Sequence, residues 1–278
     1  MVTKELHIIN VGTSILSNYG REKNIKFNFS DEASWKERLQ DNQFKSNLLA
    51  FVEGNPKRNS AELNAFLSFL EKRGIKEEDY SNIYFYLIET ATASGELCAE
   101  VIRTFLKKKG FKDLGSPKEV HGYFRELTEG EDKVERFQKG LTELLNATID
   151  VAKRKHKEGF KVYFNPTGGM KAHVIMLGLA SALSGFPSYY IHEEFKDVIE
   201  IPPLLFKPSQ EERQILFALK EVKRKTLREL EGLIEDKSKL EAILYKLSNF
   251  GLVELRDEDG KIFEVRITPL GEIITSNL

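Results

Sequence analysis

The feature that most constrains this chain is a series of short apolar runs, each ending at a turn of small polar residues before helical sequence. The clearest runs cover residues 6–11, 83–88 and 160–164. Runs of this length and composition are typical of parallel strands that are buried on both faces. Because helical sequence separates them, the pattern predicts a Rossmann-like, doubly wound, mainly parallel α/β sheet with right-handed crossovers.

The remaining elements follow from periodicity and from turn residues. We expect helices over 35–52, 60–73, 95–109, 132–157 and 172–183, and further strands over 119–124, 188–192 and 198–201. Pro202, Pro203 and Pro208 form a stiff connection. We therefore place a boundary there, between a domain of residues 1–205 and a second of residues 209–278.

The second domain has its own signature. Helical stretches over 211–222, 227–234 and 237–250 precede two strand patterns, 252–256 and 262–268, which flank an Asp-Glu-Asp-Gly turn. Three helices followed by a hairpin predict a winged helix-turn-helix domain.

Composition and charge limit the ligands and the cellular compartment that the sequence suggests. The 278 residues carry a net charge of -1 with 31% charged residues, so anion binding has to be local rather than global. The single cysteine, Cys98, excludes an intramolecular disulfide and fits a reducing compartment. No basic leader or apolar stretch of about 18 residues is present. We expect a cytoplasmic protein without a membrane partner.

Polar residues gather where the three clearest runs end. Because ligands of open α/β sheets bind beyond the carboxyl ends of the strands, these turns should form one crevice. The turns supply hydroxyls, glycines, an amide and a lysine, an inventory that suits phosphodiesters. The candidate residues are Asn10, Gly12, Thr13 and Ser14 in the first turn, Glu89, Thr90, Thr92 and Ser94 in the second, and Asn165, Thr167, Gly168, Gly169 and Lys171 in the third.

The third turn, within FNPTGGMKAH at 164–173, is the most specific of these. Free N–H groups of the following helix, its positive dipole end and Lys171 would all face one anion. A lysine at a helix start opposes the dipole unless an anion is present. The alternative is a glycine turn kept for close helix packing, with Lys171 solvated. The hydroxyls have a plain alternative too, because serine and threonine at such turns commonly cap helices.

The sequence motifs of metal binding and of nucleotide cofactor binding are not found. The five histidines do not have metal-ligand spacing, and neither a Walker sequence nor G-x-G-x-x-G is present. We therefore expect no metal and no nucleotide cofactor. The second domain carries twelve Lys and Arg against fourteen Asp and Glu, whereas DNA readers are usually basic. DNA is thus a less favoured partner of this domain than dimerisation or capping of the main domain.

Three segments resemble the CRISPR-associated Rossmann-fold (CARF) family, whose members bind cyclic oligoadenylates. They are NVGTSIL at 10–16, ETATASGEL at 89–97 and FNPTGGMKA at 164–172. The resemblance spans about residues 1–205, and a C-terminal winged helix also occurs in family members. No R-x4-6-H motif of the RNA-degrading members is found.

Among these proteins the chain looks most like the stand-alone ring nucleases. The resemblance implies a homodimer that cleaves cyclic tetra-adenylate without metal, through attack of a ribose 2′-OH. The products would be linear di-adenylates with a 2′,3′-cyclic phosphate, and cleavage would switch off type III CRISPR antiviral signalling. It also implies that Ser14 and Lys171 are catalytic and that the other candidate residues bind the substrate.

Two other interpretations stay open at this stage. One is a ligand-responsive transcription regulator that binds the ring without cleaving it and contacts DNA through its winged helix. The other is a phosphate-binding α/β protein unrelated to CRISPR. The sequence also leaves ring size open, since contacts from segments such as 18–30 or 121–131 could decide between four and six adenylates.

Overall fold

The fold was analysed in a computed structural model, which describes residues 4–116, 133–192, 197–203, 208–234, 236–258 and 261–276. The chain divides into two compact units, Met1–Ile201 and Pro202–Leu278. Each unit has a hydrophobic core of its own.

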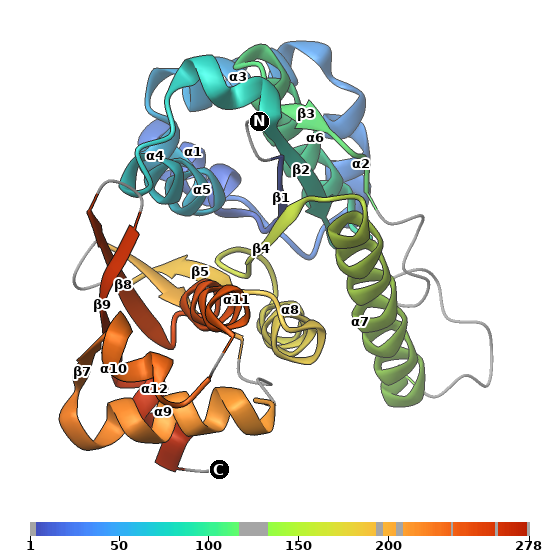
Figure 1. The fold of residues 1–278 in the computed structure, drawn as a ribbon. Coiled ribbons are helices and arrows are strands. Elements are labelled where there is room, and N and C mark those ends of the chain that lie inside the picture. Colours follow the sequence, from blue (N-terminus) through green and yellow to red (C-terminus); the bar gives the residue numbers. More distant parts are fainter. Residues whose placement is uncertain are drawn as a thin grey trace. The chain divides into compact units, whose positions relative to one another are not determined.

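The first unit alternates strands and helices (Figure 1). Its elements are β1 (Glu5–Asn10), α1 (Ser14–Lys23), α2 (Glu32–Gln40), α3 (Asn42–Gly54), α4 (Pro56–Asn59), α5 (Ala61–Lys72), the 3-10 helix η1 (Glu77–Asn82), β2 (Ile83–Ile88), α6 (Ala93–Lys108), β3 (Lys112–Asp113), α7 (Lys133–Lys157), β4 (Lys161–Asn165), α8 (Lys171–Ser184), β5 (Ser188–Ile191) and β6 (Val198–Ile201).

The six strands form one sheet in the order β3-β2-β1-β4-β5-β6. β1 pairs in parallel with β2 on one side and with β4 on the other, so that Asn10 lies opposite Ile88 and Ile9 lies opposite Asn165. Only the β5–β6 pair among the described strands of this sheet is antiparallel. The order reverses direction between β1 and β4, which confirms the predicted doubly wound sheet.

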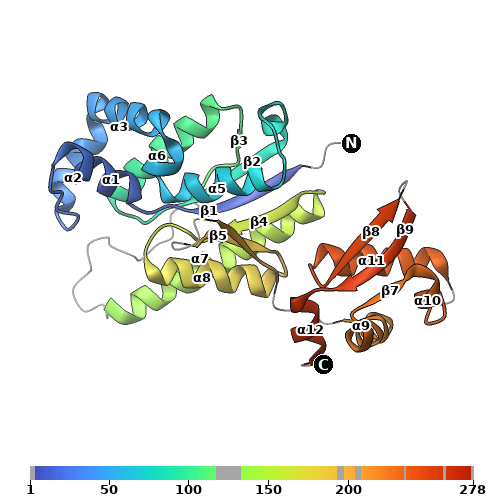
Figure 2. The ribbon, with the colours of Figure 1, turned by 90° about the vertical axis from the view of Figure 1, so that its left-hand side faces the viewer.

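Helices cover both faces of the sheet (Figure 2). Side chains of β1 alternate between the two cores, as the period of a strand requires. Ile9 belongs to the larger core, which α1, α2, α3, α5 and α6 complete, whereas Leu6 and Ile8 belong to the core under α7 and α8. Burial on both faces explains why these strands read as continuous apolar runs.

The second unit has the elements expected of a winged helix. They are α9 (Gln210–Val222), β7 (Arg224–Thr226), α10 (Leu227–Glu231), α11 (Lys237–Asn249), β8 (Val253–Glu258), β9 (Lys261–Ile267) and α12 (Pro269–Ser276). The strands form an antiparallel sheet in the order β7-β9-β8. The predicted hairpin is β8 and β9, while β7 and α12 are additions that the sequence pattern did not reveal.

Some predicted boundaries were wrong. The helix expected over 35–52 is two helices, because Asp41 lies between them and its side chain accepts hydrogen bonds from Gln43 N and Phe44 N of α3. Helix α6 begins two residues before Gly95, with Thr92 as its N-cap. Residues 18–23 of the segment 18–30 belong to α1. The strand expected at 119–124 and the segment 121–131 lie outside the described residues.

Candidate functional site

The predicted candidate residues meet at one edge of the sheet. The turn of Gly12, Thr13 and Ser14 follows β1, and the other two turns follow β2 and β4, the parallel neighbours of β1 on either side. All three turns therefore lie at the carboxyl edge. This is the edge at which open α/β sheets bind ligands, and β1 and β4 flank the reversal in strand order.

Glu62, near the start of α5, connects the first and third turns. Its side chain is 1% exposed. One carboxylate oxygen accepts a hydrogen bond from Gly12 N at 2.9 Å, and the other accepts from Ser14 Oγ at 2.5 Å and from Ser60 Oγ at 2.8 Å. Its backbone carbonyl accepts from Asn165 Nδ2 at 3.2 Å. The sequence analysis missed this residue, which lies 48 positions from Ser14 in the chain.

The Ser14 hydroxyl does not cap α1, the helix in which it lies. The N-cap of α1 is Thr13, and no side chain caps that helix by a hydrogen bond. Ser14 Oγ instead donates to Glu62 and accepts from Ala61 N at 3.1 Å. Ser14 is thus not the cap of its own helix, and its hydroxyl instead binds Glu62 and the first backbone N–H of α5.

The glycines of the third turn are needed for close packing. Gly169 has φ of +90°, a conformation that favours glycine. A Cβ at Gly168 would overlap the Glu62 carboxylate, and one at Gly169 would overlap the Asn10 amide. Asn10, fully buried, donates a hydrogen bond from Nδ2 to the carbonyl of Gly168. Close packing against Glu62 and Asn10 therefore requires both glycines, and it fixes the backbone that leads to Lys171.

The second turn is mainly a helix cap. Thr92 Oγ1 accepts a hydrogen bond from Gly95 N at 3.1 Å, which bears out the capping alternative for this residue. Thr90 and Ser94 are buried, and their hydroxyls lie 3.0 and 3.4 Å from that of Thr92. The side chain of Glu32 accepts a hydrogen bond from Ala93 N at 2.8 Å.

Helix α8 presents the N-terminus best suited to an anion. Lys171 is its first residue and is exposed, and its first turn has no acidic side chain and no side-chain cap. Within the described residues, none accepts a hydrogen bond from the backbone N–H of Gly169, Met170 or Lys171. Carboxylates of Glu62 and Glu32 already occupy N–H groups of the other two turns. Of the three turns, the one at the start of α8 is therefore best suited to bind a phosphate.

Two titratable groups at this edge have shifted pKa values. Burial raises the pKa of Glu89 to about 7, although Arg103 opposes the shift. Burial lowers the pKa of His173, on the first turn of α8, to about 4. At neutral pH His173 is uncharged, so Lys171 is the cation that α8 brings to this edge.

In the described parts of the chain, no group of three or more His, Cys, Asp or Glu side chains is placed to hold a metal ion. None of the helices described is long and apolar enough to span a membrane.

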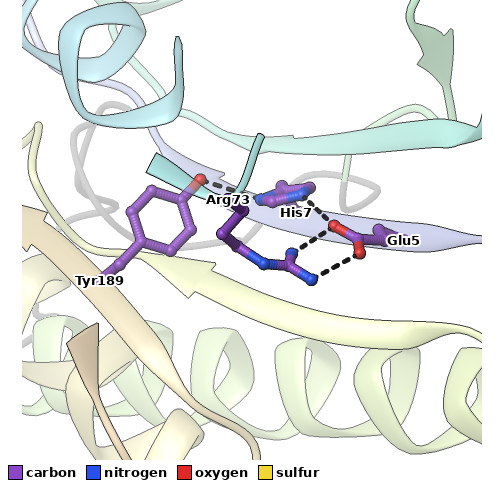
Figure 3. Close-up of polar contacts among 4 residues, drawn as sticks. All are labelled: Glu5, His7, Arg73 and Tyr189. Carbon is purple, nitrogen blue, oxygen red and sulfur yellow. Dashed lines mark hydrogen bonds and ion pairs between the residues drawn. The ribbon is translucent and has the colours of Figure 1, made fainter. Parts of the chain in front are cut away.

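A second polar cluster lies toward the opposite edge of the sheet (Figure 3). Glu5 at the start of β1 is held by Arg73, which follows α5. His7 is fully buried, and its Nδ1 is 3.0 Å from the hydroxyl of Tyr189 on β5. Since the cluster surrounds the first half of β1, it belongs to the packing of the sheet and not to the carboxyl edge.

The chain matches a model of the family described as CRISPR-associated protein (Cas_APE2256) over residues 57–204, more than half of its length. This range includes the turns after β2 and β4, and with them Lys171, but not the turn of Ser14.

A similar solved structure is the crystal structure of protein VC1899 from Vibrio cholerae. The two chains are 10% identical, and the match covers 76% of this chain and 60% of that one, with a TM-score of 0.33. The chain thus spans about 60% of the length of that structure.

The family match, together with the turns that it covers at the carboxyl edge, identifies this chain as a member of the CRISPR-associated family Cas_APE2256, a family of CARF-domain proteins.

Proposed function

We propose that the protein is a ring nuclease that binds cyclic tetra-adenylate and cleaves it without metal, which would switch off type III CRISPR antiviral signalling. The observation that carries this proposal is the position of Ser14 and Lys171 at the carboxyl ends of β1 and β4, where the strand order reverses. A hydroxyl held by hydrogen bonds and an exposed lysine at an uncapped helix N-terminus together suit a phosphodiester.

The reaction is a transesterification. The 2′ oxygen of one ribose attacks the adjacent phosphorus, and the bond from phosphorus to the 5′ oxygen breaks. The 2′-OH loses its proton, and the departing 5′ oxygen gains one. Proximity and in-line geometry supply most of the rate in such intramolecular reactions. Lys171 and the N–H groups before α8 would stabilise charge on the phosphoryl oxygens. Two such cleavages give linear di-adenylates with 2′,3′-cyclic phosphate ends.

A ring of four adenylates has approximate twofold symmetry, so the proposal includes a homodimer whose copies each supply one Ser14 and one Lys171. Helix α8 offers a surface for such pairing. Its exposed side chains include Ile175, Leu179 and Leu183, spaced four residues apart on one stripe, and they are 60%, 44% and 50% exposed. An apolar stripe that begins one turn beyond Lys171 supports a dimer axis near the site.

The proposal is tested by incubating the protein with cyclic tetra-adenylate in EDTA and separating the products by chromatography. We expect the ring to disappear and linear di-adenylate with a cyclic phosphate end to form. Persistence of the intact ring after prolonged incubation with excess protein would rule out this activity.

A ligand-responsive transcription regulator is the second candidate, and the winged-helix order of the second unit favours it. The charges of α11 argue against it. Lys237, Lys239 and Lys246 form ion pairs with Glu231, Glu211 and Glu212 of the same unit. These glutamates offset the positive charge that α11 would present to phosphates. Binding of the ring without cleavage, with a salt-dependent gel shift of promoter DNA, would favour the regulator.

A further inference from the structure

We infer that Glu62 is a positioning residue that makes Ser14 a hydrogen-bond acceptor toward the ribose 2′-OH. The inference rests on the proposed function, because it concerns how the same site holds the reacting ribose. It adds a residue that the sequence motifs do not contain.

The hydrogen bonds around Ser14 fix the direction of its hydroxyl. Glu62 has only acceptor oxygens when ionised, so the 2.5 Å contact requires Ser14 to donate its proton to Glu62. Ala61 N, a donor, uses one lone pair of Ser14 Oγ at 3.1 Å. What remains on Ser14 is one lone pair. The serine can therefore accept a hydrogen bond from a ligand but has no proton left to donate to a phosphate.

The carboxylate itself is fixed from several directions. Gly12 N and Ser60 Oγ donate to its two oxygens, and Gly168 leaves no room for it to move toward the third turn. With the side chain almost completely buried, Glu62 cannot swing out to meet a ligand. It acts through Ser14, and it also ties the turn after β1 to the turn that carries Lys171.

This polarity has a consequence for the reaction. A ligand 2′-OH that donates to Ser14 Oγ has its oxygen lone pairs directed away from the serine, toward the neighbouring phosphorus. Holding the nucleophile in this orientation is the positioning that an intramolecular displacement needs. When the 2′ oxygen attacks, its proton passes to Ser14 Oγ and the serine proton passes to Glu62, while solvent protonates the departing 5′ oxygen. After the product leaves, Glu62 returns its proton through Ser14 to solvent, which restores the starting state.

The substitution Glu62→Gln separates this role from simple packing. Glutamine keeps the shape of the side chain, but its amide can donate to Ser14 and so reverse the bond. The matched control is Glu212→Gln, which changes another buried glutamate that accepts from a helix-start backbone N–H, in the second unit. Melting temperatures report folding. If E62Q is unstable, Glu62→Asp, which withdraws the carboxylate from Ser14, carries the same prediction.

The kinetic measurement is a double-mutant cycle of single-turnover cleavage. We expect E62Q to slow cleavage by roughly 10- to 100-fold, as does the loss of an outer-shell residue that orients a metal ligand, while E212Q cleaves like the wild type. The double variant E62Q/S14A should be no slower than S14A, because the two residues act as one unit. Losses that multiply in the double variant would overturn the inference.

A binding measurement keeps the inference separate from the nuclease proposal. The wild type should bind cyclic tetra-adenylate about tenfold more tightly than its 2′-deoxy analogue, the value of one good hydrogen bond. S14A and E62Q should bind both rings alike. Binding without cleavage would contradict the nuclease proposal, but the comparison of affinities for the two rings would still test the role of Glu62. The role of Glu62 would be refuted if E62Q preferred the ribose ring over the 2′-deoxy ring as strongly as the wild type does. It would also be refuted if the wild type bound the two rings equally or bound neither.

Discussion

Arg73 donates two hydrogen bonds to the Glu5 carboxylate, at 2.6 Å and 2.9 Å, and thereby ties the end of α5 to the first residue of β1. Burial raises the pKa of Glu5, but the close approach of His7 and the two hydrogen bonds from Arg73 outweigh it and lower the pKa to about 2. Burial lowers the pKa of His7, which favours its neutral form. Arg73 is therefore the cation that keeps Glu5 ionised.

The first prediction concerns stability in acid. The pKa of Glu5 is lower in the folded chain than its usual 4.5, so the unfolded chain binds more protons between about pH 4.5 and pH 2. Glu5 thus contributes stability above pH 4.5 that is lost as the pH falls through this window, by up to about 3 kcal/mol. Urea denaturation should show that the free energy of unfolding falls less between pH 4.5 and pH 2 in Glu5→Gln than in the wild type. The exposed control Glu22→Gln should keep the wild-type slope, and equal slopes in all three would contradict the assignment.

A second prediction concerns ligand binding near neutrality. Burial raises the pKa of Glu89 to about 7, and the neutral form does not repel a polyanionic ring. Ring affinity should therefore fall as the pH rises through 7, by roughly fivefold for one unscreened charge near the surface. Calorimetry at pH 6, 7 and 8 measures this. Glu89→Gln should remove the pH dependence and Glu53→Gln should retain it, whereas a steep dependence surviving in E89Q would exclude Glu89 as its source.

The third prediction tests the pairing surface. A charge in the middle of the α8 stripe, as in Leu179→Glu, should convert the dimer into a monomer because a carboxylate cannot be buried there unpaired. Cleavage should decline with it, although Ser14 and Lys171 are unchanged. Sedimentation velocity reports the assembly, with Leu233→Glu, another exposed apolar position, as the control. A dimer that survives L179E would place the interface elsewhere.

The central strands β1, β2 and β4 could be predicted from the sequence because each is a short apolar run followed by a turn. The edge strand β3 is only the charged pair Lys112–Asp113 and was not predicted. The positions of the turns after β1, β2 and β4 follow directly from that pattern and from parallel pairing. Helix boundaries were less accessible. Asp41 divides the region 35–52 into two helices because its side chain caps α3. A single aspartate within a helical pattern is not enough to predict such a cap from the sequence.

Glu62 was missed for a different reason. It reaches Ser14 only because α5 packs beside the end of β1, a contact between residues 48 apart in sequence. A weak signal did exist. Positions 62, 66, 69 and 73 fall on one face of a helix, and two of them, Glu62 and Arg73, are charged. Charged residues on an apolar stripe require partners, and these two find theirs at opposite edges of the sheet.

The most direct test of the central claim is the single-turnover rate of cyclic tetra-adenylate cleavage by the wild type, Ser14→Ala, Lys171→Ala and the control Lys153→Ala. Lys153 is exposed on α7, whose end leads into the amino end of β4, away from the carboxyl edge. We predict a loss of about 100-fold or more for S14A and K171A, as for removal of a group that stabilises a transition state, and a wild-type rate for K153A. A wild-type rate in K171A would contradict the account.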